Sequence, residues 1–181
     1  MVQVSRLECK QKAQDILLNA LHFVVYFHEI KNIYLDFIGD GPSCDYLKAL
    51  TKELELDSYC SFLGQKSREF INANLKDYNL LVQPSTFEGF GLTVVEGMAA
   101  RIPVLVSNID GPIEIIQHGK LGYLFEVGNP RDCGKQIINI MSEYEKQGLK
   151  EKVDLAYRYA LEHFDVKQTA VDYITQYQKL M

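Results

Sequence analysis

The chain has 181 residues, which suffice for one domain with a substantial core but not for two large domains. Its apolar share of 47% is typical of globular proteins, and no apolar run reaches the length that a membrane-spanning helix requires. The net charge of −5 argues against a surface for nucleic acid or another polyanion. It leaves open a small phosphorylated ligand held by a few local cations.

Short β-rich runs alternate with helical patterns along most of the chain. The strands expected in chain order are 2–7, 33–39, 59–64, 78–85, 103–107 and 122–127. The helices expected are 12–30, 44–54, 67–75, one after Gly91, a short one at 112–118, and then 133–147, 150–164 and 166–181. Such alternation, with nearly continuous apolar strands, is typical of a parallel sheet covered on both faces. We therefore expect an α/β fold, a Rossmann-like doubly wound sheet of about six strands with extra C-terminal helices.

The cysteines and the N-terminal residues indicate a cytoplasmic protein. The four cysteines lie far apart in the sequence and form no C-x-x-C pair. This pattern favours reduced, packed cysteines over a metal site. Met1 leads directly into VQVSRL, which does not resemble a signal peptide.

Two cations lie where the first expected strand ends and the first expected helix begins. In a doubly wound sheet, ligands bind beyond the carboxyl ends of the strands, where loops lead into helices. Arg6 and Lys12 lie at such a place. Two cations beside the N–H groups of a helix start would suit a diphosphate. Taken alone, however, the two residues are better explained as solvated surface side chains.

The segment EGFGL, residues 88–92, shifts this balance toward a ligand site. It follows the strand 78–85 and precedes a helix, and Gly89 and Gly91 allow the backbone to turn sharply and approach a ligand. A helix leaves its first N–H groups without partners, and here they would point into the crevice. These donors belong to Phe90, Gly91, Leu92 and Thr93. The pattern lacks the G-x-G-x-x-G spacing of a dinucleotide fingerprint.

Two glutamates flank this glycine loop. Glu96 lies about one turn into the helix, where its carboxylate can accept two ribose hydroxyls. Separately, Glu96 fits an exposed helix position and Glu88 a loop carboxylate. Together with the intervening glycines, the pair favours a ligand site.

Several segments, taken in order, resemble one enzyme family. They are RLECKQKAQDILLNAL, FIGDGP, FLG, PSTFEGFGLTVVEGMAARIPVLVS and GPIEII…GKLGYLF. This series resembles the C-terminal, donor-binding domain of the retaining GT-B glycosyltransferases of family 4, the glycosyl transferases group 1. The resemblance runs from Val4 to the C-terminus, and its strongest motif is the E-x7-E pair Glu88 and Glu96. It implies that residues 1–181 form a single nucleotide-sugar-binding domain and that the N-terminal acceptor domain is absent.

The resemblance also implies roles for individual residues. Arg6 and Lys12 would hold the donor diphosphate and neutralise the departing nucleotide. Glu88 would act beside the donor sugar, as a nucleophile or by orienting the sugar, and Glu96 would bind the ribose. The loop from Gly89 to Thr93 would cradle sugar and phosphate, and a looser match places Gln65 and Lys66 at the base. Catalysis would then rest on Glu88, Arg6 and Lys12. The sequence departs from the family at Ser5, Ala13 and Arg101, where glycine is frequent.

The implied activity is retaining hexosyl transfer from a nucleotide-diphosphate-sugar, UDP-sugar rather than GDP-sugar, to a glycan or lipid-linked acceptor in polysaccharide or glycoconjugate biosynthesis. No cofactor or metal is expected, and no D-x-D motif appears. The isolated domain should be inactive alone, and the full-length enzyme should associate peripherally with the inner face of the cell membrane. The alternatives are a nucleotide-sugar epimerase or glycan phosphorylase on the same fold, or a catalytically silent nucleotide- or partner-binding module.

The remaining histidines and tyrosines favour packing roles. His22 and His28 lie beside apolar residues of the first helix, and Glu114 and His118 fit the ends of a short helix. The tyrosines of the last two helices are expected to form a packing seam, and the final helix to expose part of its apolar face. These residues are Tyr157, Tyr159, Tyr173, Ile174 and Tyr177.

Overall fold

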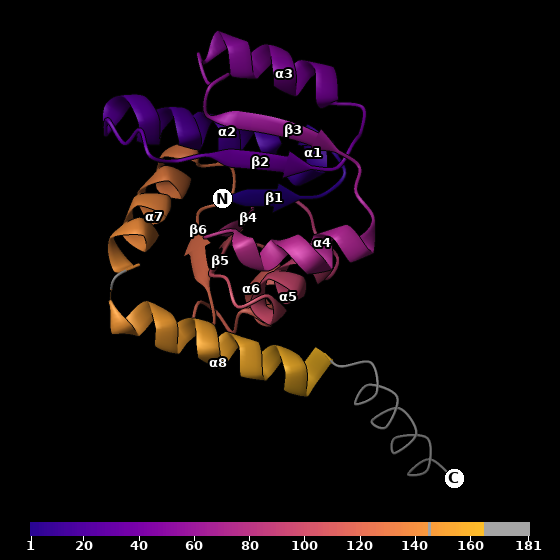
Figure 1. Cartoon of the computed structure of the whole chain (residues 1–181), viewed down its shortest axis with the longest axis vertical. Helices are drawn as coiled ribbons and strands as arrows, with labels where there is room; N and C mark the ends of the chain where they lie inside the picture. The colour runs from indigo at the N-terminus through magenta and orange to yellow at the C-terminus, as the bar shows by residue number, and fades with distance from the viewer. Residues whose placement is uncertain (145, 165–181) are drawn as a thin grey trace.

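The computed structural model describes residues 1–144 and 146–164. Within them, six strands form one sheet in the order β3-β2-β1-β4-β5-β6, and every neighbouring pair is parallel (Figure 1). The strands are β1 (Val2–Val4), β2 (Leu35–Ile38), β3 (Cys60–Gly64), β4 (Leu81–Gln83), β5 (Val104–Ser107) and β6 (Tyr123–Phe125). This confirms the α/β, Rossmann-like doubly wound sheet that the sequence predicts.

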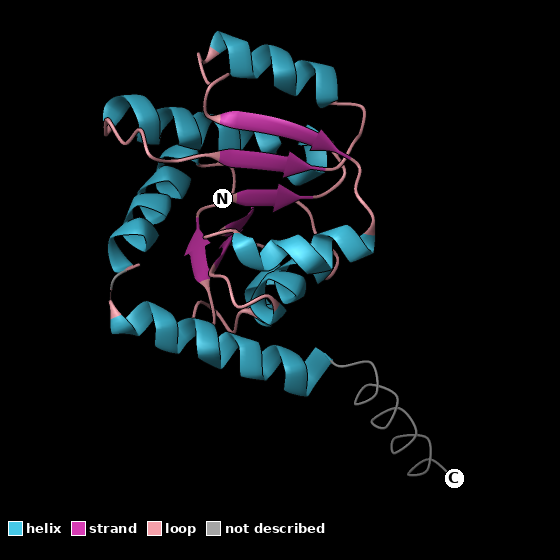
Figure 2. Cartoon of the chain, in the orientation of Figure 1, coloured by secondary structure: helices cyan, strands magenta, loops and turns pink. Residues whose placement is uncertain are grey.

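Helices cover both faces of the sheet (Figure 2). They are α1 (Cys9–Lys12), α2 (Gln14–His22), α3 (Cys44–Glu53), α4 (Arg68–Asn74), α5 (Leu92–Ala99), α6 (Pro112–Ile115), α7 (Pro130–Glu143) and α8 (Gln147–Phe164). A π-helical turn at Phe23–Phe27 and a 3-10 turn at Leu75–Asp77 complete the helical segments of the described residues. The helix expected at 166–181, with Tyr173, Ile174 and Tyr177, lies outside the described residues.

The core consists of two apolar clusters, one on each face of the sheet. Leu81 and Val82 are neighbours on β4, yet they belong to different clusters, because successive side chains of a strand point to opposite faces. One cluster includes residues of α2, α3 and α7, and the other includes residues of α5 and α8. The strands therefore read as continuous apolar runs, since both of their faces are buried.

The expected first helix, 12–30, is interrupted. Ala13 adopts a left-handed conformation, with φ +46° and ψ +43°, and separates α1 from α2. Alanine is the best helix former, so local propensity gives no signal for this bend. The expected first strand also ends early, at Val4. Beyond it, Ser5 donates its backbone N–H to Ile38, the last residue of β2, and Leu7 donates to Asp40, so the chain continues beside the sheet.

Candidate functional site

The candidate site lies where the strand order reverses, between β1 and β4. Ligands of open α/β sheets bind outside the carboxyl ends of the strands at this switch point. Two cavities, of about 380 and 250 Å³, open here, and Ser5 and Arg6 line both. The larger cavity adds Gly39, Asp40, Gln65 and Lys66, and the smaller adds Lys12, Gln83, Glu88, Phe90, Gly91, Leu92 and Thr93. Most of the residues that the sequence nominates therefore converge on one place.

Lys12 and Glu88 form an ion pair at the centre of the smaller cavity. The Nζ atom of Lys12, the last residue of α1, lies 2.5 Å from Oε2 of Glu88, in the loop after β4. Both side chains are less than a quarter exposed, at 20% and 16%. Gln83 donates its Nε2–H to the same oxygen at 2.9 Å. The sequence placed Lys12 and Glu88 in one crevice but did not predict that they would neutralise each other.

Hydrogen bonds to α1 fix the loop that carries Glu88. The backbone N–H groups of Thr86 and Phe87 donate to the carbonyl of Gln11 at 2.8 and 3.3 Å. The hydroxyl of Thr86 donates to the carbonyl of Lys10 at 2.7 Å. Helix α1, which carries Lys12, therefore also holds the loop of Glu88 in place.

The glycines of the EGFGL segment serve different purposes. Gly91 is the N-cap residue of α5 and has φ +103°. Residues other than glycine rarely adopt this backbone conformation. A Cβ atom built on Gly89 meets no atom within 4 Å, so Gly89 faces open space and lines an adjoining cavity instead. The first N–H groups of α5, at Leu92 and Thr93, have no intrahelical acceptors, and both residues line the 250 Å³ cavity.

Arg6 is free to move toward a ligand. Its side chain is 69% exposed, and its Nε atom lies 3.9 Å from Glu8, a weak surface contact. On its other side, Gln65 and Lys66 are exposed at the rim of the larger cavity. Lys66 lies 5.3 Å from the centre of the Phe70 ring.

Glu96 stands apart from the other candidate residues. It is half-buried on α5 and lines neither cavity. Burial raises the pKa of its carboxyl, and the nearby cation of Arg68, the first residue of α4, partly offsets this rise. The structure therefore places Glu96 between α5 and the start of α4, with a cation that the sequence did not reveal as its partner.

The sequence did not predict the buried polar residues that lie beneath the site. Gln83 is 1% exposed, and Gln14 is fully buried. Gln14 donates to the Ser5 hydroxyl at 3.0 Å and to the Arg6 carbonyl at 2.9 Å, and so supports the strand end that carries Arg6. The available signal was the glutamine that interrupts the apolar run LLVQ directly before the loop.

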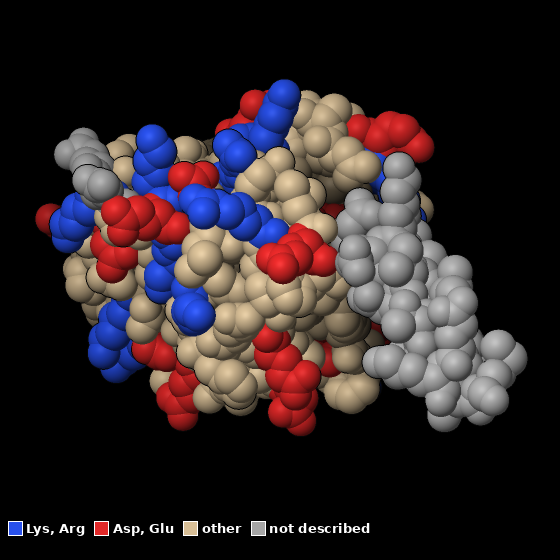
Figure 3. All heavy atoms as spheres, turned by 90° about the horizontal axis from the view of Figure 1, so that it is seen from below, with Lys and Arg blue, Asp and Glu red and all other residues tan. Residues whose placement is uncertain are grey.

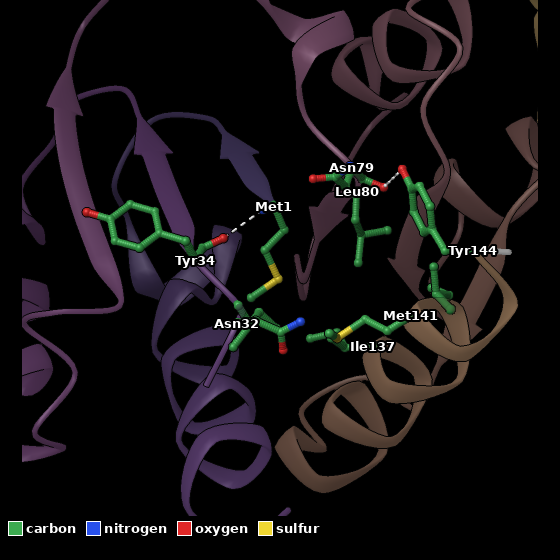
Figure 4. A pocket seen from close by; sticks show the side chains of 10 residues that line it. Met1, Asn32, Tyr34, Asn79, Leu80, Ile137, Met141 and Tyr144 are labelled. Carbon is green, nitrogen blue, oxygen red and sulfur yellow. Dashed lines mark hydrogen bonds between the residues drawn. The ribbon is translucent and has the colours of Figure 1, made fainter. Parts of the chain in front are cut away.

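A further cavity, of about 330 Å³, lies at the amino ends of the strands, between β1, β4 and α7 (Figure 4). Met1, Leu80, Ile137 and Met141 supply apolar side chains, and the hydroxyl of Tyr144 closes one side with a hydrogen bond to the Asn79 carbonyl at 2.8 Å. None of the described side chains that line it is charged. Among the described residues it therefore lacks the cationic side chains and helix starts that gather at the opposite edge.

Charges of both signs lie on the described surface around α8. Figure 3 shows Lys and Arg side chains interspersed with Asp and Glu on this face. In the part of the chain that the structure describes, no helix is long and apolar enough to cross a membrane. The same residues hold no group of three or more His, Cys, Asp or Glu side chains that could bind a metal ion.

The fold and the cleft define a doubly wound α/β domain with a cation-lined site at its switch point. The family model for glycosyl transferases group 1 matches residues 1–153, and the chain belongs to this family. It is 34% identical over 137 residues to an uncharacterized glycosyltransferase of Methanocaldococcus jannaschii, covering 75% of this chain and 36% of the relative. It is 30% identical over 145 residues to N-acetyl-alpha-D-glucosaminyl L-malate synthase of Bacillus anthracis, covering 80% and 36%. The chain thus spans about a third of the length of these relatives.

Solved structures give the same picture. The Anabaena HepE structure in complex with UDP matches with a TM-score of 0.85 and 26% identity, over 99% of this chain and 48% of HepE. A HepE complex with UDP-glucose matches with a TM-score of 0.82 at the same identity and coverage. The C-terminal domain of a group 1 glycosyl transferase from Francisella tularensis shares the fold, with a TM-score of 0.78 at 20% identity, over 91% of this chain and 86% of that domain. The chain therefore corresponds to the C-terminal half of GT-B enzymes.

Proposed function

We propose that this domain binds the nucleotide-diphosphate-sugar donor of a retaining glycosyltransferase, with UDP-sugar preferred over GDP-sugar. The observation that carries the proposal is the convergence of Arg6, Lys12, Glu88 and the start of α5 on one cavity at the switch point. The likeness to HepE, which was solved with UDP and with UDP-glucose, supports the uridine nucleotide.

Fixed electrostatics would hold the diphosphate. Arg6 and Lys12 supply two cations, and the N–H groups of Leu92 and Thr93 supply donors at the positive end of the α5 dipole. These groups favour negative charge that grows on the leaving diphosphate as the glycosidic bond breaks, so they would lower the barrier to transfer. Arg6, with its loose contact to Glu8, would swing onto the phosphates.

Glu88 and the glycine loop would hold the sugar. The Glu88 carboxylate accepts hydrogen bonds through Oε2, which leaves Oε1 for sugar hydroxyls. Gly89, with open space in front of its Cα atom, would let the sugar approach the backbone. In the retaining mechanism that we favour, the bond between the anomeric carbon and the diphosphate breaks, and the acceptor hydroxyl forms its bond on the same face of the sugar. The departing diphosphate takes the proton of that hydroxyl. Glu88 would then orient the sugar.

The 380 Å³ cavity would receive the nucleoside. Gln65 and Lys66 at its rim would contact the base, and Glu96 would bind the ribose hydroxyls. Because Glu96 lines neither cavity, this role requires the ribose to reach over the first turn of α5. Arg68 favours the ionised carboxylate that would accept these hydroxyls.

The rest of the enzyme would complete the reaction. We propose that residues 1–181 form the donor half and that an opposing N-terminal domain holds a glycan or lipid-linked acceptor, so that hexosyl transfer requires both halves. Proximity and orientation of donor and acceptor supply much of the rate in such reactions. We place the full-length enzyme in the cytoplasm, at the inner face of the cell membrane, and assign it no metal or other cofactor.

Calorimetry with UDP, GDP and UDP-glucose tests this proposal. The wild type should bind UDP saturably, and Arg6→Ala should weaken binding by about 10- to 100-fold, the loss of one charge-assisted contact. Arg131→Ala, which removes an exposed arginine on α7, is the matched control and should leave the affinity unchanged. Equal affinity of the wild type and an Arg6→Ala/Lys12→Ala double variant would refute the diphosphate site.

A further inference from the structure

A buried glutamine lies directly against the Glu88 carboxylate. Gln83, the last residue of β4, is 1% exposed and lines the 250 Å³ cavity. Its Nε2 atom donates to Oε2 of Glu88 at 2.9 Å and to Oγ of Ser85 at 3.1 Å. Its carbonyl oxygen has no hydrogen-bond partner among the described residues. Burying an amide costs free energy unless its N–H and C=O groups form hydrogen bonds. The position of Gln83 beside the cavity therefore needs an explanation.

The sheet holds this glutamine firmly. Gln83 pairs with Val106 of β5 in the parallel ladder. Ser107 of β5 donates its hydroxyl to the carbonyl of Ser85, and both serines are fully buried. The backbone of Gln83 is therefore fixed in the sheet, and its amide rests on Ser85, which β5 holds through Ser107. Glu88, in contrast, stands on a loop.

Lys12 and Gln83 bond to the same oxygen of Glu88, at 2.5 and 2.9 Å. Under the proposed function, the Lys12 ammonium turns toward the diphosphate when the donor binds. Glu88 then loses its charged partner while a sugar arrives beside it. Among the described contacts of Glu88, the hydrogen bond from Gln83 is the one that would remain to fix the carboxylate.

We propose that Gln83 is a positioning residue, which holds the Glu88 carboxylate toward the donor sugar when Lys12 engages the diphosphate. A neutral amide suits this task, because it donates a hydrogen bond to Glu88 and carries no negative charge that would attract Lys12 away from the diphosphate. The inference rests on the proposed function, since it assigns Gln83 to the sugar end of that donor site.

Binding of UDP and of UDP-glucose by Gln83→Leu separates positioning from a general structural role. We expect the UDP affinity to stay within about twofold, and the UDP-glucose affinity to fall about tenfold further, because only the sugar contacts of Glu88 are loosened. In a Glu88→Ala background, which removes the acceptor of the Gln83 amide, Gln83→Leu should cause no further loss. Gln3→Leu is the matched control, because Gln3 is equally buried, also has an unpartnered carbonyl, and donates to Ser5 rather than to Glu88. It should leave the ratio of the two affinities unchanged.

An NMR measurement leaves Gln83 in place and so does not depend on the folding of its variants. The side-chain amide protons of Gln83 should exchange slowly in the wild type and in Lys12→Met, and at least about tenfold faster in Glu88→Ala, because only the last variant removes the acceptor. Unchanged exchange in Glu88→Ala, or equal losses for UDP and UDP-glucose in Gln83→Leu, would overturn the role of Gln83. A wild type that binds UDP normally distinguishes this failure from a failure of the proposed function, in which no nucleotide binds.

Discussion

Replacing Lys12 with methionine should weaken UDP binding more than replacing Arg6 with alanine. Arg6 is 69% exposed and would contribute one charge-assisted contact to the diphosphate, whereas Lys12 would contribute such a contact and also neutralises Glu88. Loss of the ammonium removes about 1.5–3 kcal/mol of contact with the diphosphate. It also leaves an unpaired carboxylate in the same cavity, and its repulsion of the diphosphate adds on the order of 1–3 kcal/mol at an effective dielectric constant near that of a protein surface. Together the two effects amount to about 2.5–6 kcal/mol, which is a loss of roughly 10²- to 10⁴-fold in affinity.

Removal of the charge on Glu88 tests this reasoning. In Lys12→Met/Glu88→Gln the repulsion disappears, so UDP should bind more tightly than it does to Lys12→Met alone, although two candidate ligand residues have been changed. Isothermal titration calorimetry of the wild type, both single variants and the double variant gives the coupling between the two sites. UDP is the probe because it lacks the sugar that Glu88 would contact. If the double variant binds UDP no better than Lys12→Met, the ion pair does not control the charge of the cleft.

Two further predictions concern ribose binding and the glycines. Because burial raises the pKa of Glu96, its carboxyl becomes protonated as the pH falls through a value above the usual glutamate range, and UDP binding should weaken across that window. A calorimetric pH series should show this slope in the wild type but not in Glu96→Gln; parallel curves would exclude Glu96 from binding. The same raised pKa means that the ionised side chain is unfavourable in the fold, so its contribution to stability should improve as the pH falls. Gly89→Ala should keep its stability but lose UDP-glucose affinity, because its Cβ atom would occupy the open space of the adjoining cavity through which the sugar is proposed to approach the backbone. Gly39→Ala, by contrast, should lose more than about 3 kcal/mol of unfolding free energy, since its Cβ atom would stand 1.8 Å from the Ser5 carbonyl oxygen. Chemical denaturation and calorimetry distinguish the two, and a destabilised but fully binding Gly89→Ala would contradict the first expectation.

The sheet could be predicted from the sequence because the patterns that indicate strands and helices are local. Apolar strands alternate with amphipathic helices, and a strand with both faces buried reads as a continuous apolar run. The start of α5 was equally visible, since glycines before an apolar helix indicate a sharp turn. By the same logic, the residues after β1 and β4 were expected to share one crevice, and the structure brings them together.

Long-range contacts carry no such local signal. Lys12 and Glu88 are 76 residues apart, and only the β1–β4 adjacency brings them into contact. Arg68 approaches Glu96 from another helix, and no spacing in the sequence reveals it. Gln83 was overlooked because a single polar residue at the end of an apolar strand does not reveal that its side chain is buried against Glu88. What was missed is therefore the pairing of charges and not the convergence of the residues after β1 and β4 on one cavity.

The backbone at Ala13 and Arg101 explains why glycine is frequent at these two positions in the family. Both residues have positive φ, at +46° and +57°, where glycine is favoured and other residues are strained. At Arg101, the guanidinium lies 4.0 Å from the centre of the Tyr157 ring, a favourable contact that offsets part of the strain. At Ala13, the methyl group is 2% exposed and gains from burial.

The bend at Ala13 should therefore tolerate glycine and reject valine. Ala13→Gly relieves the strain but loses a buried methyl group worth about 0.8 kcal/mol and adds freedom to the unfolded chain, so the net change in unfolding free energy should stay within about 1 kcal/mol. Ala13→Val puts a β-branched side chain into a left-handed conformation at a packed position, and should cost about 2–4 kcal/mol. The bend joins the end of α1, which carries Lys12 and the Gln11 carbonyl that holds the Glu88 loop, to α2. Ala13→Val should consequently also lose UDP affinity under conditions in which it is still folded, while Ala13→Gly keeps it. Denaturant titrations and calorimetry on both variants provide the measurement, and a stable Ala13→Val with unaltered binding would show that the site does not depend on this bend.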